Sequence, residues 1–307
     1  MILITSKAHS ILQETLEKKG HQVVYEPHIT YEELEKIIPQ AEGIVVTTRL
    51  KIDRNLIDKA IALKWIGRLG SGLELIDTEH AAKKNISSFS SSEGNRNAVG
   101  EHALGLVLNL MNNICRSSRE VQEYIWKRNE NRGWELKGRT VGLVGYGNTG
   151  QAFAQLLQPF GVTILAYDKY KEGFAGGLVR EVNLEHITRY AEIISFHVPL
   201  TEETFHMADK GFFDALKQKP WIINTSRGKV LDTIALSNAL KESKISGAAL
   251  DVLENEKLES LSQDEKVWFE FLRTHPDVLL TPHIAGYTHE AFMKMSVILL
   301  EKIEHLL

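Results

Sequence analysis

Short apolar runs alternate with amphipathic segments along most of this chain. In its first third, brief apolar runs bounded by turn-forming residues predict strands at residues 1–6, 22–25, 43–47, 64–69 and 86–89. Apolar residues at helical spacing predict helices between them, at residues 9–19, 30–38, 53–63 and 77–84. Because strands alternate with helices, we predict an α/β fold with a doubly wound parallel sheet.

The same alternation returns in the second half of the chain. Strands are predicted at residues 141–144, 162–168, 193–198, 221–224, 248–252 and 278–280, with helices at 151–160, 209–217 and 233–241. An acidic, turn-rich stretch at residues 254–266 predicts a surface loop. A last helix, after Tyr287, is expected to fold back onto the first unit. The pattern therefore predicts two doubly wound parallel sheets.

Residues 91–97, which join the two halves, are polar and rich in turn-forming types, so we place a crossing between domains there. Residues 98–126 predict one long helix whose apolar side chains cover more than one face. Such a helix should be buried on two sides, within the chain or against a second subunit. Cys115 lies in the same apolar pattern and is expected in the core.

Composition narrows the class of protein. Hydrophobic residues make up 43% and charged residues 25% of the 307 positions, as in an ordinary globular protein. The formal net charge is −4 and no Lys/Arg cluster stands out, so we expect no nucleic-acid partner. We expect no signal peptide and no membrane partner, and the single cysteine suits a reducing cytoplasm.

The first chemical signal is a glycine-rich turn between a predicted strand and a predicted helix. Gly145, Gly147 and Gly150 have the spacing G-x-G-x-x-G. The first glycine permits the turn, the second lets the backbone approach a pyrophosphate, and the third lets helix and strand pack closely. The amides and positive dipole of the helix N-terminus favour phosphates. Alone, the spacing is weak support, because three glycines can mark three turns.

Asp168 strengthens this interpretation. It ends the next predicted strand, 18 residues after Gly150, about where a carboxylate accepts hydrogen bonds from the ribose of a dinucleotide. The alternative is a turn residue at a strand end. With the glycine turn in place we favour the ribose role, predict NAD as the cofactor, and assign no metal ligands.

Two other predicted strands are followed directly by residues capable of chemistry. Arg227 could bind a carboxylate through two parallel hydrogen bonds, although a surface ion pair is the simpler interpretation. His283 could donate a proton, although one histidine among 12 is by default structural. Glu256 could hold the tautomer of His283 and favour its charged ring, or it could be a solvated loop acid.

Seven sequence blocks, in order, resemble the D-isomer-specific 2-hydroxyacid dehydrogenase family over nearly the whole chain. They are residues 70–77, 98–101, 145–150, 197–201, 224–228, 247–252 and 281–283. An ordered set is far more specific than any single motif. The resemblance therefore favours functional roles for Arg227 and His283, in a compact member without a regulatory domain.

The resemblance implies an architecture and a chemistry. A Rossmann cofactor domain, residues 98–286, would be inserted into a flavodoxin-like substrate domain, residues 1–97 and 287–307. The reaction would interconvert a D-2-hydroxy acid and its 2-keto acid. Arg227 would bind the substrate carboxylate and polarise the keto group, and His283, paired with Glu256, would exchange a proton with the carbonyl oxygen.

The resemblance also implies ligand contacts and an oligomeric state. The implied substrate contacts, besides Arg227, are Ser71, Gly72, Leu73 and Asn95. The implied NAD contacts are Gly145, Gly147, Asn148, Thr149, Gly150, Asp168, Val198, Thr225, Ser226, Asp251 and Gly286. Because the family usually dimerises through the cofactor domain, we expect a homodimer.

Departures from the family pattern leave alternatives open. Lys257 stands where proline usually follows the catalytic glutamate, so Glu254 is a rival to Glu256. Many phosphoglycerate-oxidising members carry Arg-Ser after the third strand, where this chain has residues 47–48, both threonine, and then Arg49. 3-Phosphoglycerate is therefore one candidate substrate, and glyoxylate or hydroxypyruvate is another. An NAD(H)-sensing binding protein is the alternative from another class.

Overall fold

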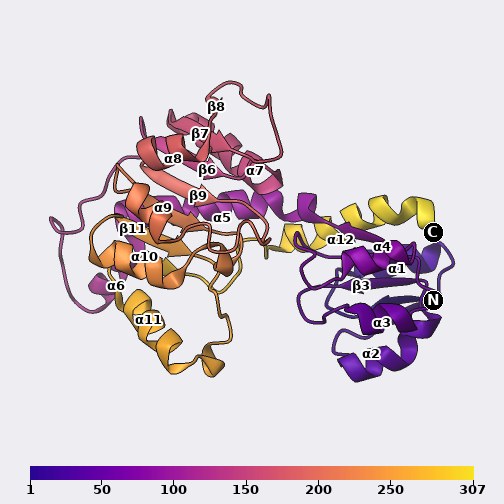
Figure 1. Ribbon diagram of the computed structural model, residues 1–307. Helices are drawn as coiled ribbons and strands as arrows, with labels where there is room; N and C mark the ends of the chain where they lie inside the picture. Colours follow the sequence, from indigo (N-terminus) through magenta and orange to yellow (C-terminus); the bar gives the residue numbers. More distant parts are fainter. The chain divides into compact units, whose positions relative to one another are not determined.

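The computed structural model describes all residues from 1 to 307 and divides them into two compact units (Figure 1). The first unit comprises Met1–Arg96 and Gly286–Leu307, and the second comprises Asn97–Ala285. Both units are built on parallel sheets. We describe each unit by itself.

The first unit has a five-stranded sheet in the order β2-β1-β3-β4-β5. Its strands are β1 (Ile2–Ile4), β2 (Val23–Tyr25), β3 (Gly43–Val46), β4 (Trp65–Arg68) and β5 (Ser87–Ser90), and every pairing is parallel. This strand order is that of flavodoxin-like sheets. The predicted doubly wound fold of this unit is confirmed.

Alternating side chains of β1 build two cores on the two faces of this sheet, because successive residues of a strand point to opposite sides. Ile2 and Ile4 belong to the core that includes α1 (Ser10–Lys18) and α12 (His289–Ile303). Leu3 belongs to the other core, with helices α2 (Tyr31–Ile37), α3 (Arg54–Lys59) and α4 (Thr78–Lys83). The expected return of the last helix to the first unit is confirmed.

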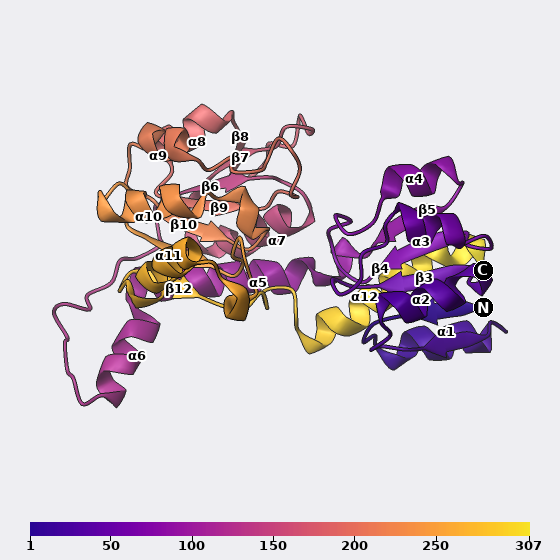
Figure 2. The ribbon, with the colours of Figure 1, turned by 60° about the horizontal axis from the view of Figure 1, so that its bottom comes forward.

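The second unit has a seven-stranded sheet in the order β12-β11-β10-β9-β6-β7-β8 (Figure 2). The strands are β6 (Thr140–Val144), β7 (Thr163–Tyr167), β8 (Val179–Glu181), β9 (Ile193–Phe196), β10 (Trp221–Asn224), β11 (Gly247–Leu250) and β12 (Val278–Leu280). All pairings are parallel. The order reverses between β6 and β9, which is the Rossmann arrangement with one more strand.

Helices pack on both faces of this second sheet. One core joins α7 (Asn148–Leu157) to the part of α5 (Ser92–Asn112) that lies in this unit. The opposite core joins α8 (Leu184–Tyr190), α9 (Lys210–Ala215) and α10 (Thr233–Lys241), together with Leu272 of α11 (Gln263–Thr274). The sheet is therefore buried on both sides, as its apolar strands require.

The predicted single helix over residues 98–126 is wrong in its bounds and its continuity. Helix α5 begins at Ser92, inside the stretch expected to be turn-rich, and ends at Asn112. Asn113 adopts a left-handed backbone with φ of 53°, which interrupts the helix before α6 (Ile114–Gln122). Cys115 then lies exposed at the start of α6, so its predicted core position is also wrong.

Three elements escaped prediction. Strand β8 is three residues long and α8 is seven, which is too short for a clear periodic pattern. Helix α11 occupies part of the predicted acidic loop, and Ser262 begins it through a capping box with Glu265. None of the helices combines the length and the apolar composition needed to cross a bilayer.

Candidate active site

Six of the loops that follow strands of the second sheet carry residues singled out from the sequence. Because all seven strands are parallel, these loops share one edge of the sheet, at the carboxyl ends of the strands. The reversal of strand order between β6 and β9 lies within this edge, and such reversals are where doubly wound sheets bind ligands. The residues that directly follow the strands are Gly145, Asp168, His197, Thr225, Asp251 and Thr281.

The glycine turn has the geometry that its spacing predicts. Gly145 has φ of +98°, and a Cβ there would lie 2.5 Å from the carbonyl oxygen of His197. A Cβ at Gly150 would lie 2.3 Å from the carbonyl oxygen of Gly145. Gly147 is different, because nothing lies within 4 Å of the place where its Cβ would be. The turn is thus tightly packed on the protein side and open at Gly147.

Gly147 is also the N-cap of α7, and no side chain caps that helix. The amides of the first turn of a helix have no partner within the helix, and the dipole makes this end positive. Asn148 and Thr149 are the first two residues of α7. The open N-terminus of α7 therefore has the geometry for a bound phosphate.

Asp168 lies directly beside this turn. Its carboxylate accepts hydrogen bonds from the amide of Tyr146 at 2.8 Å and from the amide of Tyr170 at 3.0 Å. One bond reaches each oxygen, so each keeps a further lone pair for a hydroxyl donor. The nearby Lys169 is paired with Glu203 at 2.5 Å. Asp168 is thus held where it can accept the two hydroxyls of a ribose.

The turn that carries Arg227 is organised by Asn224, whose role the sequence did not reveal. The Oδ1 atom of Asn224 accepts from the amide of Ser226 at 3.0 Å and from its hydroxyl at 2.8 Å, and Nδ2 donates to the carbonyl of Arg227 at 2.9 Å. Asn224 is 1% exposed. An asparagine at a strand end with a serine two residues later is the signal for such a turn.

Arg227 is half-buried, and its Nη1 donates to the carbonyl of Ser226 at 2.7 Å. Beside it, the hydroxyl oxygen of Thr225 is buried and has no hydrogen-bond partner in the protein. Buried polar atoms are nearly always paired. The unpaired hydroxyl of Thr225 at the ligand edge fits a bound group that exchanges a hydrogen bond with it.

His283 and Glu256 form a close pair. The Nδ1 atom of His283 lies 3.0 Å from both carboxylate oxygens of Glu256. Nε2 forms no hydrogen bond or ion pair within the protein, so it is the nitrogen available to a ligand. His283 has φ of +56°, a left-handed conformation that is uncommon for residues other than glycine and clusters at functional sites.

Several groups around Glu256 act on its pKa. Partial burial raises the pKa, but the hydrogen bond and charge of His283, a backbone bond at Leu253 and the charge of Arg227 act in the other direction. The result is a pKa below the ordinary value of a glutamate. Glu256 is therefore ionised at neutral pH and places a negative charge beside the ring of His283.

Asp251 holds the turn that contains His283. Its carboxylate accepts from the hydroxyl of Thr281 at 2.6 Å and from the amides of Ile284 and Ala285 at 2.9 and 2.8 Å. Its backbone carbonyl accepts from the amide of His283 at 2.7 Å. Asp251 is 1% exposed, so these bonds form away from water. The strained turn of His283 is fixed by this one buried carboxylate.

Comparison with known proteins identifies this arrangement. Residues 104–285 match the NAD binding domain of the D-isomer specific 2-hydroxyacid dehydrogenases. The chain belongs to this family. The prediction of the family is confirmed, and so is the prediction of NAD as the cofactor, because the matched domain is the one that binds it.

Individual relatives agree with this assignment. The chain is 34% identical over 290 residues to a hydroxypyruvate reductase of Thermotoga maritima, covering 94% of this chain and 92% of that one. It is 34% identical over 301 residues to a D-3-phosphoglycerate dehydrogenase of Archaeoglobus fulgidus, covering 96% of this chain but only 56% of that protein. The crystal structure of a D-lactate dehydrogenase of Aquifex aeolicus, complexed with NAD and lactic acid, superposes with a TM-score of 0.85 at 27% identity, covering 100% of this chain and 96% of that one.

Val198 follows β9 in the second unit, and the predicted residues Ser71, Gly72, Leu73, Asn95 and Gly286 lie in the first unit. Ser71, Gly72 and Leu73 belong to the loop that follows β4, and the hydroxyl of Ser71 lies 3.3 Å from Oδ1 of Asn95. Gly286 also lies here, where a Cβ would be 2.6 Å from Nδ2 of Asn95. The structure thus groups Ser71, Asn95 and Gly286, and their roles toward ligands stay predictions.

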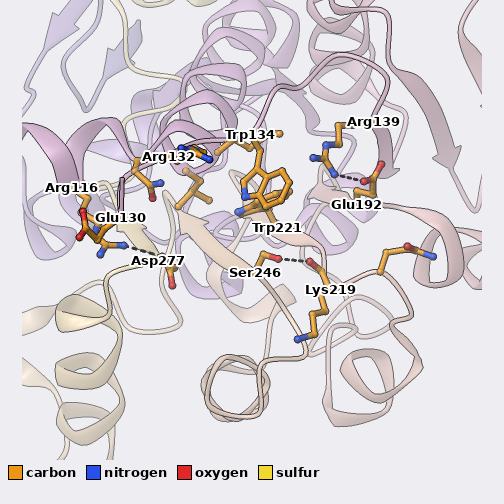
Figure 3. Close-up of a pocket in the computed structure, with 14 residues that line it drawn as sticks. Arg116, Glu130, Arg132, Trp134, Arg139, Glu192, Lys219, Trp221, Ser246 and Asp277 are labelled. Carbon is orange, nitrogen blue, oxygen red and sulfur yellow. Dashed lines mark hydrogen bonds and ion pairs between the residues drawn. The ribbon is translucent and has the colours of Figure 1, made fainter. Parts of the chain in front are cut away.

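A cavity of about 420 Å³ lies at the opposite edge of the second sheet, away from the predicted residues (Figure 3). Its lining includes residues that directly precede strands, such as Arg139, Glu192 and Asp277. Arg139 is paired with Glu192 at 2.5 Å, and Arg116 lies 3.8 Å from Asp277. Chemistry in parallel sheets occurs at the carboxyl ends of the strands, so we give this cavity no part in the reaction.

Proposed function

We propose that the protein is an NAD-dependent oxidoreductase that interconverts a D-2-hydroxy acid and its 2-keto acid. The observation that carries the proposal is the pair formed by His283 and Glu256, at the sheet edge that also holds Arg227 and the open N-terminus of α7. Proton donor, carboxylate-binding cation and dinucleotide site are the parts such a reaction needs.

The residues of the second unit fit the cofactor. NADH, when bound, supplies the hydride that reduces the keto carbon. The first turn of α7 binds the pyrophosphate through its amides and dipole. Asp168 accepts the ribose hydroxyls, and its negative charge repels a 2′-phosphate. The unpaired hydroxyl of Thr225 adds a hydrogen bond.

His283 moves the proton. Reduction places negative charge on the carbonyl oxygen, and an imidazolium that donates from Nε2 neutralises that charge. Glu256 accepts from Nδ1, which fixes the orientation of the ring and stabilises its charged form. In the oxidation direction the neutral ring takes the proton back from the hydroxyl.

Arg227 binds and polarises the substrate. The guanidinium is always charged and presents a planar pair of donors that matches a carboxylate. The turn built by Asn224 fixes the backbone from which this side chain extends. The same positive charge stabilises the developing negative charge on the carbonyl oxygen.

Two kinds of substrate are proposed. One is 3-phosphoglycerate. The other is a smaller acid, in which case the enzyme would reduce glyoxylate or hydroxypyruvate. Among the cations after β3, Arg49 already donates to the carbonyl of Thr5 at 2.7 Å. Because Arg49 is engaged in this bond, the position gives no support to an arginine that binds the phosphate of 3-phosphoglycerate. The relatives include both a hydroxypyruvate reductase and a longer D-3-phosphoglycerate dehydrogenase.

A panel of 2-keto acids with NADH tests the proposal. Glyoxylate, hydroxypyruvate, pyruvate and phosphohydroxypyruvate are offered separately, and loss of NADH absorbance is followed. Turnover of at least one acid, strongly reduced in Arg227→Ala, supports the proposal. Tight NADH binding by fluorescence, with no turnover of any acid, would instead make the protein an NAD(H)-sensing binding protein.

We also propose a homodimer in the cytoplasm. Most of the apolar side chains of α5 that suggested a partner are buried within the second unit, Ala103, Val107 and Met111 among them. The exposed apolar surface lies further on, where Tyr124 is 99% and Trp126 81% exposed. Such a concentration of exposed aromatic side chains is typical of a protein interface. A free thiol at Cys115 suits a reducing compartment.

A further inference from the structure

Two residues before Glu256 lies a second glutamate with its own histidine. The carboxylate of Glu254 lies 2.8 Å from Nε2 of His206, and its other oxygen accepts from the amide of Thr233 at 2.8 Å. Both oxygens are therefore engaged, and the side chain is about a quarter exposed. Glu254 is thus not the partner of His283 but the centre of a separate contact.

This contact joins three segments that are distant in sequence. Glu254 lies on the segment that leads from β11 to Glu256, and Thr233 is the first residue of α10. His206 lies on the loop after β9, and its amide donates to the carbonyl of Lys229 at 2.8 Å. Lys229 belongs to the short helix that directly follows Arg227. The pair therefore ties the segment of Glu256 to the segment of Arg227.

The two segments also touch directly at Gly228. A Cβ there would lie 1.9 Å from the carbonyl oxygen of Leu253 and 2.5 Å from the amide nitrogen of Glu254. Only glycine permits this approach of one backbone to the other. A backbone bond at Leu253 is also among the causes that lower the pKa of Glu256. The peptide between Leu253 and Glu254 is therefore held against Gly228.

His206 shows the strain expected of a residue that is fixed by its neighbours. It has φ of 50°, and its ring stacks on Phe205 with centroids 4.1 Å apart. A left-handed backbone in a residue other than glycine persists only where surrounding contacts hold it. The contacts that hold it are those to Glu254, Lys229 and Phe205.

We propose that Glu254 and His206 are positioning residues, which keep Glu256 against His283 and Arg227 in its turn without touching the reacting atoms. The expected change in rate rests on the proposed function. The contacts that join the segment of Glu256 to the segment of Arg227 do not depend on it. Loss of the pair should loosen Glu256 from His283. Glu254→Ala should then resemble Glu256→Gln in its effect on His283, although the carboxylate of Glu254 contacts His206 and not His283.

The test compares Glu254→Ala with the conservative Glu254→Gln, which keeps an acceptor for Thr233 and a partner for His206. The ring protons of His283 are followed by NMR through a pH titration, and the same variants are assayed for keto-acid reduction across pH. In Glu254→Ala we expect the titration of His283 and the rate profile to move to lower pH, with a loss of up to about fivefold above the inflection. In Glu254→Gln both should stay near wild type.

Further variants separate coupling from loss of folding. The double variant Glu254→Ala/Glu256→Gln should shift the titration no further than Glu256→Gln alone, because both changes act through one contact. His206→Asn, whose side chain tolerates the left-handed backbone, should reproduce Glu254→Ala while NADH binding and melting temperature stay near wild type.

The outcomes keep the two proposals apart. A shifted titration in Glu254→Ala together with no turnover by wild type overturns the proposed function and supports the positioning role. Normal turnover with an unshifted titration and an unshifted rate profile in both Glu254→Ala and His206→Asn overturns the positioning role. A shift in the double variant that exceeds that of Glu256→Gln would show that Glu254 acts by another route, which also overturns it.

Discussion

Replacing Glu256 by glutamine removes the negative charge beside His283 while keeping the size of the side chain. The carboxylate oxygens lie 3.0 Å from Nδ1, and the two side chains are 40% and 46% exposed. At about 4 Å between charge centres, a unit pair interacts with about 1 kcal/mol in water and about 4 kcal/mol at an effective dielectric constant of about 20. Solvent screening of such exposed groups lowers the interaction to about 1 kcal/mol at most.

An energy of about 1 kcal/mol corresponds to a shift of about 0.7 pH unit. The sign follows from the charge. The pKa of Glu256 lies below its ordinary value of 4.5, so the carboxylate is ionised throughout the neutral range and favours the protonated ring. Reduction needs the protonated ring and falls as pH rises through an inflection. Glu256→Gln should therefore move this inflection up to about 0.7 unit toward lower pH, with up to about a fivefold rate loss above it and little loss well below it.

The assay is kcat for keto-acid reduction, measured with saturating NADH across the stable pH range, with oxidation of the hydroxy acid measured in parallel. Oxidation needs the neutral ring, so its inflection should move in the same direction and its rate at intermediate pH should be retained. Glu254→Gln serves as the matched control, because it lies in the same loop but faces His206. An unmoved inflection in Glu256→Gln, or an equal shift in the control, would refute the reasoning.

Four further outcomes are expected. His283→Asn should lower kcat by ~10²–10⁴-fold while NADH still binds, and full activity would remove His283 from the mechanism. Arg227→Ala should raise KM for the keto acid and lower kcat together, and a change in only one of them would contradict its double role. Asp168→Ala should narrow the preference for NADH over NADPH, mainly by weakening the binding of NADH. Equal kcat/KM values for the two cofactors in the wild type would contradict the assignment of Asp168 to the ribose. Trp126→Ala should weaken the dimer in sedimentation at micromolar concentration, and a wild type that is already monomeric would refute the dimer.

The edge of the sheet that carries the candidate site could be predicted because it depends on a local rule. Each of Gly145, Asp168, Arg227 and His283 lies at most three residues beyond an apolar strand, and parallel strands end at one edge. Alternation of strands and helices is enough to predict that the strands are parallel. The geometry of the glycine turn followed as well, since only glycine tolerates the contact that Gly145 makes with the carbonyl of His197.

Elements whose signal is weak or interrupted could not be predicted as well. The apolar pattern continues across Asn113, so the sequence suggested one helix where a single left-handed residue separates two. Helix α11 begins in an acidic stretch, where charge suggested a loop although Ser262 and Glu265 form a capping box there. In both places one residue decided the backbone, and averaging over a window of residues hides such a position.

The choice between Glu254 and Glu256 shows where spacing stops being informative. Residues two apart in an extended strand point to the same side, so both carboxylates could have faced His283. The chain instead bends at Glu254, and the two side chains meet different histidines.

The bend lies where the peptide between Leu253 and Glu254 rests on Gly228, a contact between positions far apart in sequence. In the sequence Gly228 was only the neighbour of Arg227 in a family motif. Because Gly228 has no Cβ, the backbone of the Arg227 turn can pack directly against the backbone of the Glu256 segment. The contacts that distinguish the proposed catalytic pair from its proposed supporting pair therefore join distant positions, and no local sequence pattern contains them.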